Sequence, residues 1–402
     1  YEAALETVIT ANSKDKFKPK YIAATATIRR AADQVKKLYG RKVNIFPPPG
    51  TSSDDSHFAK TNHEALGRLY IGVMNQGHTQ DTSLVRLSAA LRQSVIDCQL
   101  SDEAKDTWWT QIIYHNSRRE LGKSMTKSKD DIPKRVRVIM TDEKNMRKLA
   151  NVEELSGSRP ASEIPQVLSK LEKRFDDKAA IDILPCTNMI SVGVDVSRLG
   201  LMLVFGQPKT TAEYIQASSR VGRSNKYPPG IVVTLYSPYK PRDRSHYENF
   251  YAYHKKLYRA VEPTSVTPYA EPSRHRSLHA ALVIIMRHAA GLDSEDKAKD
   301  FDPSATKITE IIEALEERMC NAEPEEKEAI KKDIKERVEE WYKKTKNPEG
   351  EIETKLKYSA GKQFINLLSQ YNDHDSDSWR TLNSMRNIDV ESIIRVTGGG
   401  DG

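Results

Sequence analysis

The chain has 402 residues with 63 Lys or Arg and 56 Asp or Glu, which gives a formal net charge of +7 at pH 7. This length suits two or three domains, and the small basic excess permits a nucleic-acid partner without requiring one. The sequence shows no run of about 18 apolar residues and no signal peptide, so we expect no membrane partner. The three cysteines form no C-x-x-C pair, which argues for a reducing, cytoplasmic compartment and against a zinc or other metal site.

Residues 1–43 are predicted to form a short helix, a strand at 20–24 and an amphipathic helix at 29–39. Thr25, Ala26 and Thr27 follow the strand. Taken alone, they are interpreted as an ordinary strand end, in which Thr27 could cap the next helix. The chain opens at Tyr1 without a methionine, inside an apparent helix, and we therefore expect it to be part of a longer protein.

The composition divides the rest of the chain into three parts. Residues 44–60 are rich in Pro, Ser, Asp and Gly and are predicted to be a linker. Residues 61–262 alternate strands and helices, which predicts an α/β fold whose parallel sheet is covered by helices on both faces. Residues 263–402 are predicted to be mainly helical. The predicted strands are 69–73, 111–115, 136–140, 181–185, 201–205 and 230–236, and the C-terminal helices are 279–290, 306–346 (interrupted near 322–325) and 360–371.

The stretch 181–223 carries the strongest chemical signal. Two apolar strands bracket a loop that contains Thr187, Gly193 and Asp195, and a predicted helix follows. Gln216, Arg220 and Arg223 are spaced at i, i+4 and i+7, so they would project from one helix face. An amide and guanidinium groups on one face suit a polyanion, because arginine forks match phosphate oxygens. The alternative is a solvated basic helix face.

Two further stretches leave alternatives open. Asn116, Ser117 and Arg118 follow the strand 111–115, and Ser117 could simply cap a helix there. Residues 236–258 interleave tyrosines with Lys, Arg and His, a pattern that suits stacking on the bases of a single strand. The competing interpretation is a helix that packs its tyrosines onto the sheet and leaves its cations in water. The Glu and Lys run at 306–346 indicates a solvated helical face, with partner docking as the second interpretation.

Two segments carry a family resemblance. TNMISVGVD at 187–195 resembles motif V of superfamily 2 helicases, and QASSRVGR at 216–223 resembles motif VI, with Ser219 in place of the usual Gly. The resemblance implies that Arg220 and Arg223 act as arginine fingers on ATP together with Gln216, and that Gly193 and Asp195 line the ATP side. A RecA-like domain at 61–262 follows from the same resemblance.

The same family resemblance extends to two other segments, residues 25–27 and residues 116–118. Thr25-Ala26-Thr27 resembles motif III, which couples ATP hydrolysis to the nucleic-acid cleft, and 1–43 would then be the last part of a first RecA-like domain. Asn116, Ser117 and Arg118 resemble motif IV. With Thr187, they are expected to contact the nucleic-acid backbone.

Two stretches imitate the phosphate-binding half of such a site. Gly122-Lys123-Ser124 matches the tail of a P-loop, but the Gly required five residues earlier is Ser117. The strand predicted at 136–140, followed by Asp142 and Glu143, imitates a Walker B element but comes after motif III, whereas in helicases that element precedes it. We expect the P-loop and most of the ATP and Mg²⁺ contacts to lie in a missing N-terminal part, and this chain alone to be inactive.

Together with SWRTLNSMRNIDVES at 378–392, these features resemble the DrmA family, the helicase component of DISARM anti-phage systems. The resemblance implies an ATP-dependent DNA helicase or translocase in bacterial defence, acting on DNA that includes single-stranded segments and working with a DrmB-like partner subunit. A superfamily 2 helicase of DNA repair and a non-catalytic, helicase-fold DNA-binding scaffold remain as alternatives.

Overall fold

The structure is a computed structural model, and it describes residues 1–15, 17–25, 27–48, 57–58, 60, 62, 64–65, 67–191, 195–263, 266–346, 356–361, 363–370 and 377–381. The chain divides into two compact units. Residues 24–29 and 47–264 form the first, here called the sheet unit. Residues 1–23, 30–46 and 265–402 form the second, called the helical unit.

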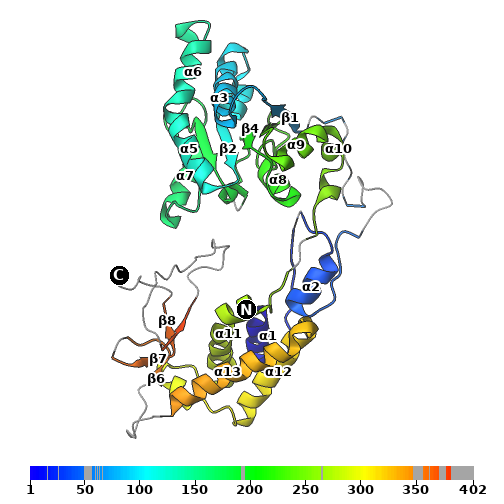
Figure 1. The fold of residues 1–402 in the computed structure, drawn as a ribbon, viewed down its shortest axis with the longest axis vertical. Coiled ribbons are helices and arrows are strands. Elements are labelled where there is room, and N and C mark those ends of the chain that lie inside the picture. Colours follow the sequence, from blue (N-terminus) through cyan, green and yellow to red (C-terminus); the bar gives the residue numbers. More distant parts are fainter. Residues whose placement is uncertain are drawn as a thin grey trace, which may run out of the picture. The chain divides into compact units, whose positions relative to one another are not determined.

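The sheet unit is built on five parallel strands in the order β1-β5-β4-β2-β3 (Figure 1). All five were predicted within two residues at their starts, because their apolar runs are bounded by polar turns. An extended segment at 152–155 adds isolated parallel bridges to β3. The strands are β1 (Leu69–Met74), β2 (Gln111–His115), β3 (Ile183–Cys186), β4 (Leu201–Phe205) and β5 (Ile231–Tyr236).

Successive side chains of each strand are buried on opposite faces of this sheet. On β2, for example, Tyr114 joins one apolar cluster and Ile113 joins another. Helices α7 and α8 cover the first face, whereas α3 and α6 cover the second. The predicted parallel sheet with helices on both faces is therefore confirmed. The helices of this unit are α3 (Gln80–Asp97), α4 (Asp102–Trp109), α5 (Arg118–Lys129), α6 (Asp131–Ile139), α7 (Ile164–Leu171), α8 (Thr211–Ser218), α9 (Pro241–Glu248) and α10 (Phe250–Lys255), with short turns η1 (Glu143–Asn145), η2 (Ala161–Glu163), η3 (Asn188–Ser191) and η4 (Leu257–Ala260).

Three predicted elements are wrong in the described chain. Residues 136–139 end helix α6 instead of forming a strand, because Ile132 and Val136, four residues apart, both pack into the cluster shared with α3. Residues 20–24 form no strand, and the helix expected at 360–371 is replaced by short strands at 365–366 and 368–369. At 136–140, the β-branched residues have a local preference for a strand, but packing of this segment against α3 favours a helix.

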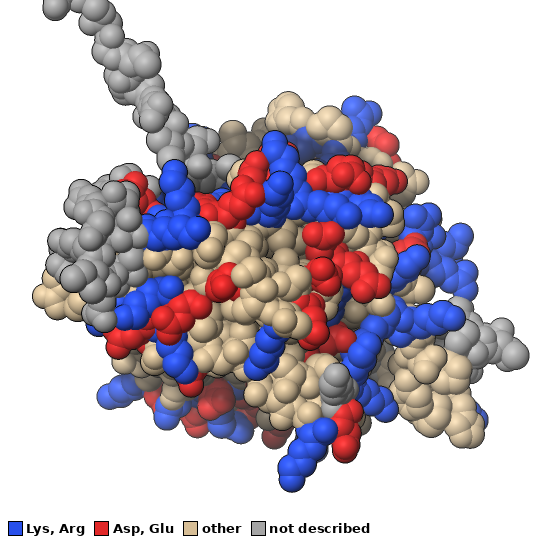
Figure 2. Space-filling view, turned by 90° about the horizontal axis from the view of Figure 1, so that it is seen from below, with Lys and Arg blue, Asp and Glu red and all other residues tan. Residues whose placement is uncertain are grey.

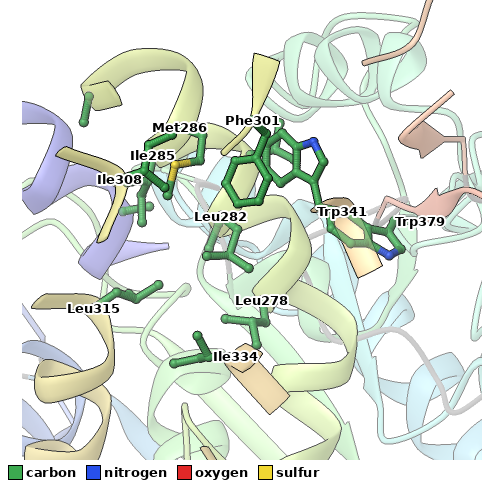
Figure 3. Close-up of a cluster of buried hydrophobic side chains, with 14 of the residues drawn as sticks. Leu278, Leu282, Ile285, Met286, Phe301, Ile308, Leu315, Ile334, Trp341 and Trp379 are labelled. Atoms are coloured by element: carbon green, nitrogen blue, oxygen red, sulfur yellow. The ribbon is translucent and has the colours of Figure 1, made fainter. Parts of the chain in front are cut away.

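The helical unit packs α1, α11, α12 and α13 around one apolar core (Figure 1). Leu282 of α11 and Trp341 of α13 lie at the core, where Phe301 stacks on Trp341 with ring centroids 4.2 Å apart (Figure 3). The predicted mainly helical region and its break near 322–325 are confirmed. Its elements are α1 (Glu2–Asn12), α2 (Ala31–Tyr39), α11 (Glu271–Ile285), η5 (Met286–Ala290), η6 (Glu295–Asp300), α12 (Thr306–Ala322), η7 (Pro324–Glu326), α13 (Lys327–Thr345), and the short strands β6 (Leu356–Lys357), β7 (Ile365–Asn366), β8 (Leu368–Ser369) and β9 (Trp379–Arg380).

The N-terminal segments join this helical unit through one carboxylate. Glu6 of α1 accepts a hydrogen bond from Arg41 at 2.6 Å and another from Arg318 of α12. Burial alone would raise the pKa of Glu6, but the two guanidiniums outweigh it and hold that pKa below its usual value. Most of the predicted segment 1–43 therefore packs with the C-terminal helices, and only 24–29 belongs to the sheet unit. Of the predicted linker, 49–56 and 59 lie outside the described residues, as does the tail from 382 onward.

Charges on the helical unit are mixed in sign. Figure 2 shows Lys and Arg interspersed with Asp and Glu on the face that it displays. Along α13, Lys332 pairs with Glu336 and Lys335 with Glu339, at i, i+4 and largely exposed. Such pairs stabilise a helix only slightly, and they fit the predicted solvated face. No helix among the described residues is long and apolar enough to cross a membrane.

Candidate nucleotide and nucleic-acid site

The motif VI arginines are presented by a loop and not by a helix. Helix α8 ends at Ser218, so the predicted single helix through Gln216, Arg220 and Arg223 is wrong beyond its first member. The chain turns at Gly222, whose φ of +61° lies in the left-handed region, and the Gly222 N–H donates to the Leu199 carbonyl at 2.8 Å. This turn lies between Arg220 and Arg223, so Arg223 does not continue along the axis of α8.

Arg68 holds the same loop from outside. Its Nε donates to the carbonyl of Val221 at 2.6 Å, and its Nη2 donates to the carbonyl of Ser219 at 3.3 Å. These carbonyls follow the C-terminus of α8 and would otherwise lack helical partners. Arg68 therefore supports the shape of the loop from which Arg220 and Arg223 project.

Each arginine contacts a residue of motif V. Nη2 of Arg220 donates to the carbonyl of Ser191, and Nη1 of Arg223 lies 2.8 Å from Oδ1 of Asp195. Burial, and then the positive charge of Arg223, lower the pKa of Arg220 from its usual value, whereas Asp195 acts in the opposite direction. An anion placed between the two guanidiniums would relieve their mutual repulsion. Motif V lies in the predicted loop and motif VI in the following predicted helix. The contacts of Arg220 with Ser191 and of Arg223 with Asp195 thus join the two motifs into one charged corner of the sheet unit.

Gln216 connects this corner to the predicted motif III. It is exposed near the end of α8, and its Nε2 donates to Oγ1 of Thr27 at 2.9 Å. Thr25 in turn accepts a hydrogen bond from the Thr27 N–H at 3.3 Å. Two residues expected at these sites, Ala26 and Gly193, lie outside the described residues. The described members of motifs III and VI are therefore in direct contact.

The motif IV residues lie at the carboxyl edge of the sheet. The strand register aligns His115 of β2 with Phe205 of β4, so Asn116 follows beside the end of β4. Nδ2 of Asn116 donates to the carbonyls of Phe205 and Gly206 at 3.1 and 3.2 Å. The amide of Asn116 is thus used inside the protein, where it joins two strand ends.

Ser117 and Arg118 open helix α5 at the same edge. Oγ of Ser117 accepts the N–H of Glu120 at 3.2 Å, which confirms the helix cap that was one of the two interpretations. Arg118 is exposed and donates to Oγ of Ser158 through Nε at 3.0 Å. Thr187, at the end of β3, is only 7 % exposed. Of the four residues predicted to contact nucleic acid (Asn116, Ser117, Arg118 and Thr187), Arg118 is therefore the one with an exposed, positively charged hydrogen-bond donor.

A histidine at this edge adds no charge. His115 is buried, and burial lowers its pKa to about 3, so the ring is neutral at pH 7. The exposed cations that the described residues place here are Arg118 and its neighbour Arg119, at the N-terminus of α5.

Sequence reasoning missed several residues that shape the site. Asp243 of α9 is buried and accepts the N–H groups of Gln207 and Ser237, at 3.0 and 2.8 Å, just after the ends of β4 and β5. Arg68 and Ser191 also went unnoticed, because Arg68 donates to backbone carbonyls distant in sequence and Ser191 accepts from the distant Arg220 through its own carbonyl. Gly222 had a usable signal, since an isolated Gly after a helix often adopts positive φ.

The imitation P-loop lies inside a helix. Gly122, Lys123 and Ser124 fall in the middle of α5, where backbone N–H groups are already used in the helix. Asp142 caps the short turn η1 by accepting the N–H of Lys144 at 3.0 Å. Neither stretch has the geometry of a phosphate loop or of an acidic strand end. Among the described residues, no group of three or more His, Cys, Asp or Glu side chains is placed to hold a metal ion.

Known proteins resemble this chain in sequence. Residues 104–225 match the family described as helicase conserved C-terminal domain. The DISARM protein DrmA of Bacillus paralicheniformis is 38 % identical over 412 residues, a match that covers 98 % of this chain. The chain spans only 36 % of the length of that relative.

Solved structures are more distant. The DUF1998 helicase MrfA bound to DNA and AMPPNP is 15 % identical, with a TM-score of 0.47 over 78 % of this chain and 38 % of MrfA. The Mycobacterium smegmatis helicase Lhr bound to ssDNA and AMP-PNP is 14 % identical, with a TM-score of 0.47 over 82 % of this chain and 36 % of Lhr. Because both TM-scores are below 0.5, the assignment rests on the domain match and on DrmA. Residues 104–225 therefore match the helicase conserved C-terminal domain, and the chain resembles the DISARM protein DrmA over nearly its whole length.

Proposed function

We propose that this chain is the C-terminal part of an ATP-dependent DNA helicase or translocase that acts in bacterial anti-phage defence. The observation that carries the proposal is the corner where Arg220 and Arg223 meet Ser191 and Asp195 of motif V. The similarity to the DISARM protein DrmA supports the defence role. A DrmB-like partner subunit is part of the same proposal. The free cysteines Cys98, Cys186 and Cys320 are compatible with a cytoplasmic protein.

The two arginines suit the role of fingers for a nucleotide held by the rest of the protein. ATP with Mg²⁺ would supply the phosphoryl group and the charge that must be stabilised. Arg223 would exchange its contact with Asp195 for phosphate oxygens, and Arg220 would act beside it. Because Gln216 bonds to Thr27, a change at the nucleotide would also reach motif III. DNA-stimulated ATP hydrolysis by the full-length protein tests this proposal.

DNA is proposed to run along the carboxyl edge of the sheet, contacted through phosphates and not through base edges. Arg118, Ser117 and the N-terminus of α5 would hold the backbone, with Asn116 and Thr187 shaping the strand ends beside them. In open α/β sheets, ligands occupy the crevice at these strand ends. A phosphate track of this kind is indifferent to base sequence.

Replacing Arg118 with Ala is expected to lower DNA affinity about equally for unrelated sequences. One phosphate contact would be lost, so the slope of log K against log salt should fall by about one. Fluorescence anisotropy over a salt series measures both quantities. Arg137→Ala, an exposed arginine near the end of α6, is the matched control. If affinity and slope are unchanged in Arg118→Ala and in Thr187→Ala, the strand runs elsewhere.

These 402 residues alone are expected to hydrolyse no ATP, although they fold, because Gly122-Lys123-Ser124 lies in a helix. A coupled phosphate-release assay on the purified chain, with and without DNA, checks this. Measurable turnover that persists through repeated purification would contradict the prediction and would place a nucleotide site within the chain.

A further inference from the structure

We propose that an exposed aromatic ridge of the sheet unit binds single-stranded nucleic acid by stacking its bases. The aromatic ridge consists of three tyrosines and three cations that follow strand β5: Tyr239, Tyr251, Lys255, Lys256, Tyr258 and Arg259. This inference extends the proposed DNA path. It requires no ATP hydrolysis, so it can be tested on this chain.

Other aromatic residues of the same segment point inward and pack against the rest of the sheet unit. Tyr253 and His254 face the sheet, where Nε2 of His254 lies 3.1 Å from the Tyr214 hydroxyl and the His254 ring lies 4.8 Å from that of Tyr70. Phe250 contacts the His254 ring at 4.1 Å. Phe250, Tyr253 and His254 are therefore committed to the fold.

The three ridge tyrosines are largely exposed, although the ring of Tyr251 also has an edge contact with that of Phe250 at 5.9 Å. Tyr239 is 80 % exposed, Tyr251 is 82 % exposed and Tyr258 is 65 % exposed. Aromatic rings normally bury much of their area, because water solvates their faces poorly. Open ring faces accept nucleobases of any identity, since every base has a π-face. The exposure of these rings indicates a binding surface and not a packing role.

The charges around the rings favour a polyanion. Lys255, Lys256 and Arg259 are exposed, and no ion pair to their side chains occurs within the described residues. The acidic groups of the segment already have partners. Asp243 is buried on backbone N–H groups, Glu262 accepts both the N–H and the hydroxyl of Thr211, and the exposed Glu248 pairs with Arg244 at 2.9 Å. The ridge therefore presents cations without ion pairs close in sequence to open aromatic rings, and single-strand binding surfaces combine these two kinds of side chain.

The ridge begins beside the proposed phosphate track. Helix α9 starts shortly after the carboxyl end of β5, and Nζ of Lys240 lies 3.2 Å from Oε1 of Glu120. Glu120 belongs to the first turn of α5, the helix that Ser117 caps and Arg118 opens. A strand held by phosphates at Arg118 could thus continue onto the ridge with its bases turned toward Tyr251 and Tyr258. Duplex DNA would gain nothing there, because its base faces are already stacked.

The test measures binding of a labelled oligo(dT) of about 15 nucleotides by anisotropy. The double variant Tyr251→Ala/Tyr258→Ala should bind more weakly, by roughly 5- to 150-fold for each ring that stacks. The matched variant Tyr251→Phe/Tyr258→Phe keeps both rings and should bind like wild type. Affinity for a duplex of equal length should not change. A thermal melt confirms that each variant folds, as expected for side chains this exposed.

Two results would overturn the proposal. Unchanged affinity of the Ala variant for oligo(dT) would show that the ridge serves another partner, such as a protein subunit. Loss of affinity in the Phe variant as well would assign the effect to the hydroxyls and not to stacking. An oligo(rU) arm distinguishes RNA from DNA as the source of the strand. If Arg118→Ala weakens binding and the ring variants do not, the phosphate contact at Arg118 is supported and the aromatic ridge is refuted. If the ring variants weaken binding and Arg118→Ala does not, the ridge is supported and the phosphate contact is refuted.

Discussion

Arg223→Ala in the full-length protein is expected to lower DNA-stimulated ATP hydrolysis by about 10³- to 10⁵-fold, the range of an arginine finger. The effect should fall on turnover and not on folding. Arg223 and its partner Asp195 have side chains that are 36 % and 71 % exposed, and ion pairs at such sites contribute about 0–1 kcal/mol to stability. Steady-state kinetics at saturating DNA, together with a thermal melt, separate the two effects.

Two matched variants sharpen this experiment. Arg86→Ala removes an exposed arginine from α3 and should leave turnover near wild type. Arg223→Lys keeps the charge but loses the planar fork, so it should recover only part of the activity. Turnover of Arg223→Ala close to wild type would refute the finger assignment. A wild-type protein that binds DNA but hydrolyses no ATP would instead favour the scaffold hypothesis.

The site could be predicted where local sequence determines structure. Strands β2 and β4 were placed at their observed bounds, because apolar runs ended by polar turns leave few alternatives. The partners of Arg220 and Arg223 could not be predicted in the same way. Arg220 and Arg223 reach Ser191 and Asp195 from a turn that is held by Leu199 and Arg68, and such long-range contacts leave no periodic pattern in the sequence.

The segment after β5 shows why one stretch supported two interpretations. Tyr253 packs on the sheet, as the packing interpretation required, whereas Tyr251 and Tyr258 are exposed, as the stacking interpretation required. Composition could not separate them, because the division follows the direction of each side chain on two short helical turns. The packing interpretation is therefore confirmed for Tyr253, whereas base stacking by Tyr251 and Tyr258 stays a prediction.

Gly222→Ala is expected to destabilise the sheet unit by at least about 2 kcal/mol, since two costs add. The φ of +61° disfavours any L side chain, and a Cβ at this position would lie 2.6 Å from the N and 2.7 Å from the Cα of Gly230. Both neighbours are backbone atoms, so they cannot turn aside as a flexible side chain would. Urea denaturation followed by circular dichroism gives the free energy of unfolding.

Gly122→Ala provides the control within the same unit. Gly122 lies inside α5 with nothing within 4 Å of an added Cβ, so this change should stabilise by about 0.5–1 kcal/mol. The two variants also test whether the motif VI loop at Gly222 matters for ATP hydrolysis and the imitation P-loop at Gly122 does not. If Gly222 shapes the arginine loop, its Ala variant should lose ATP hydrolysis in the full-length protein even at temperatures where it remains folded, whereas Gly122→Ala should keep full activity. A Gly222→Ala protein with wild-type stability and turnover would mean that the loop can move away from Gly230 without cost, and that the positions of Arg220 and Arg223 do not depend on the left-handed turn.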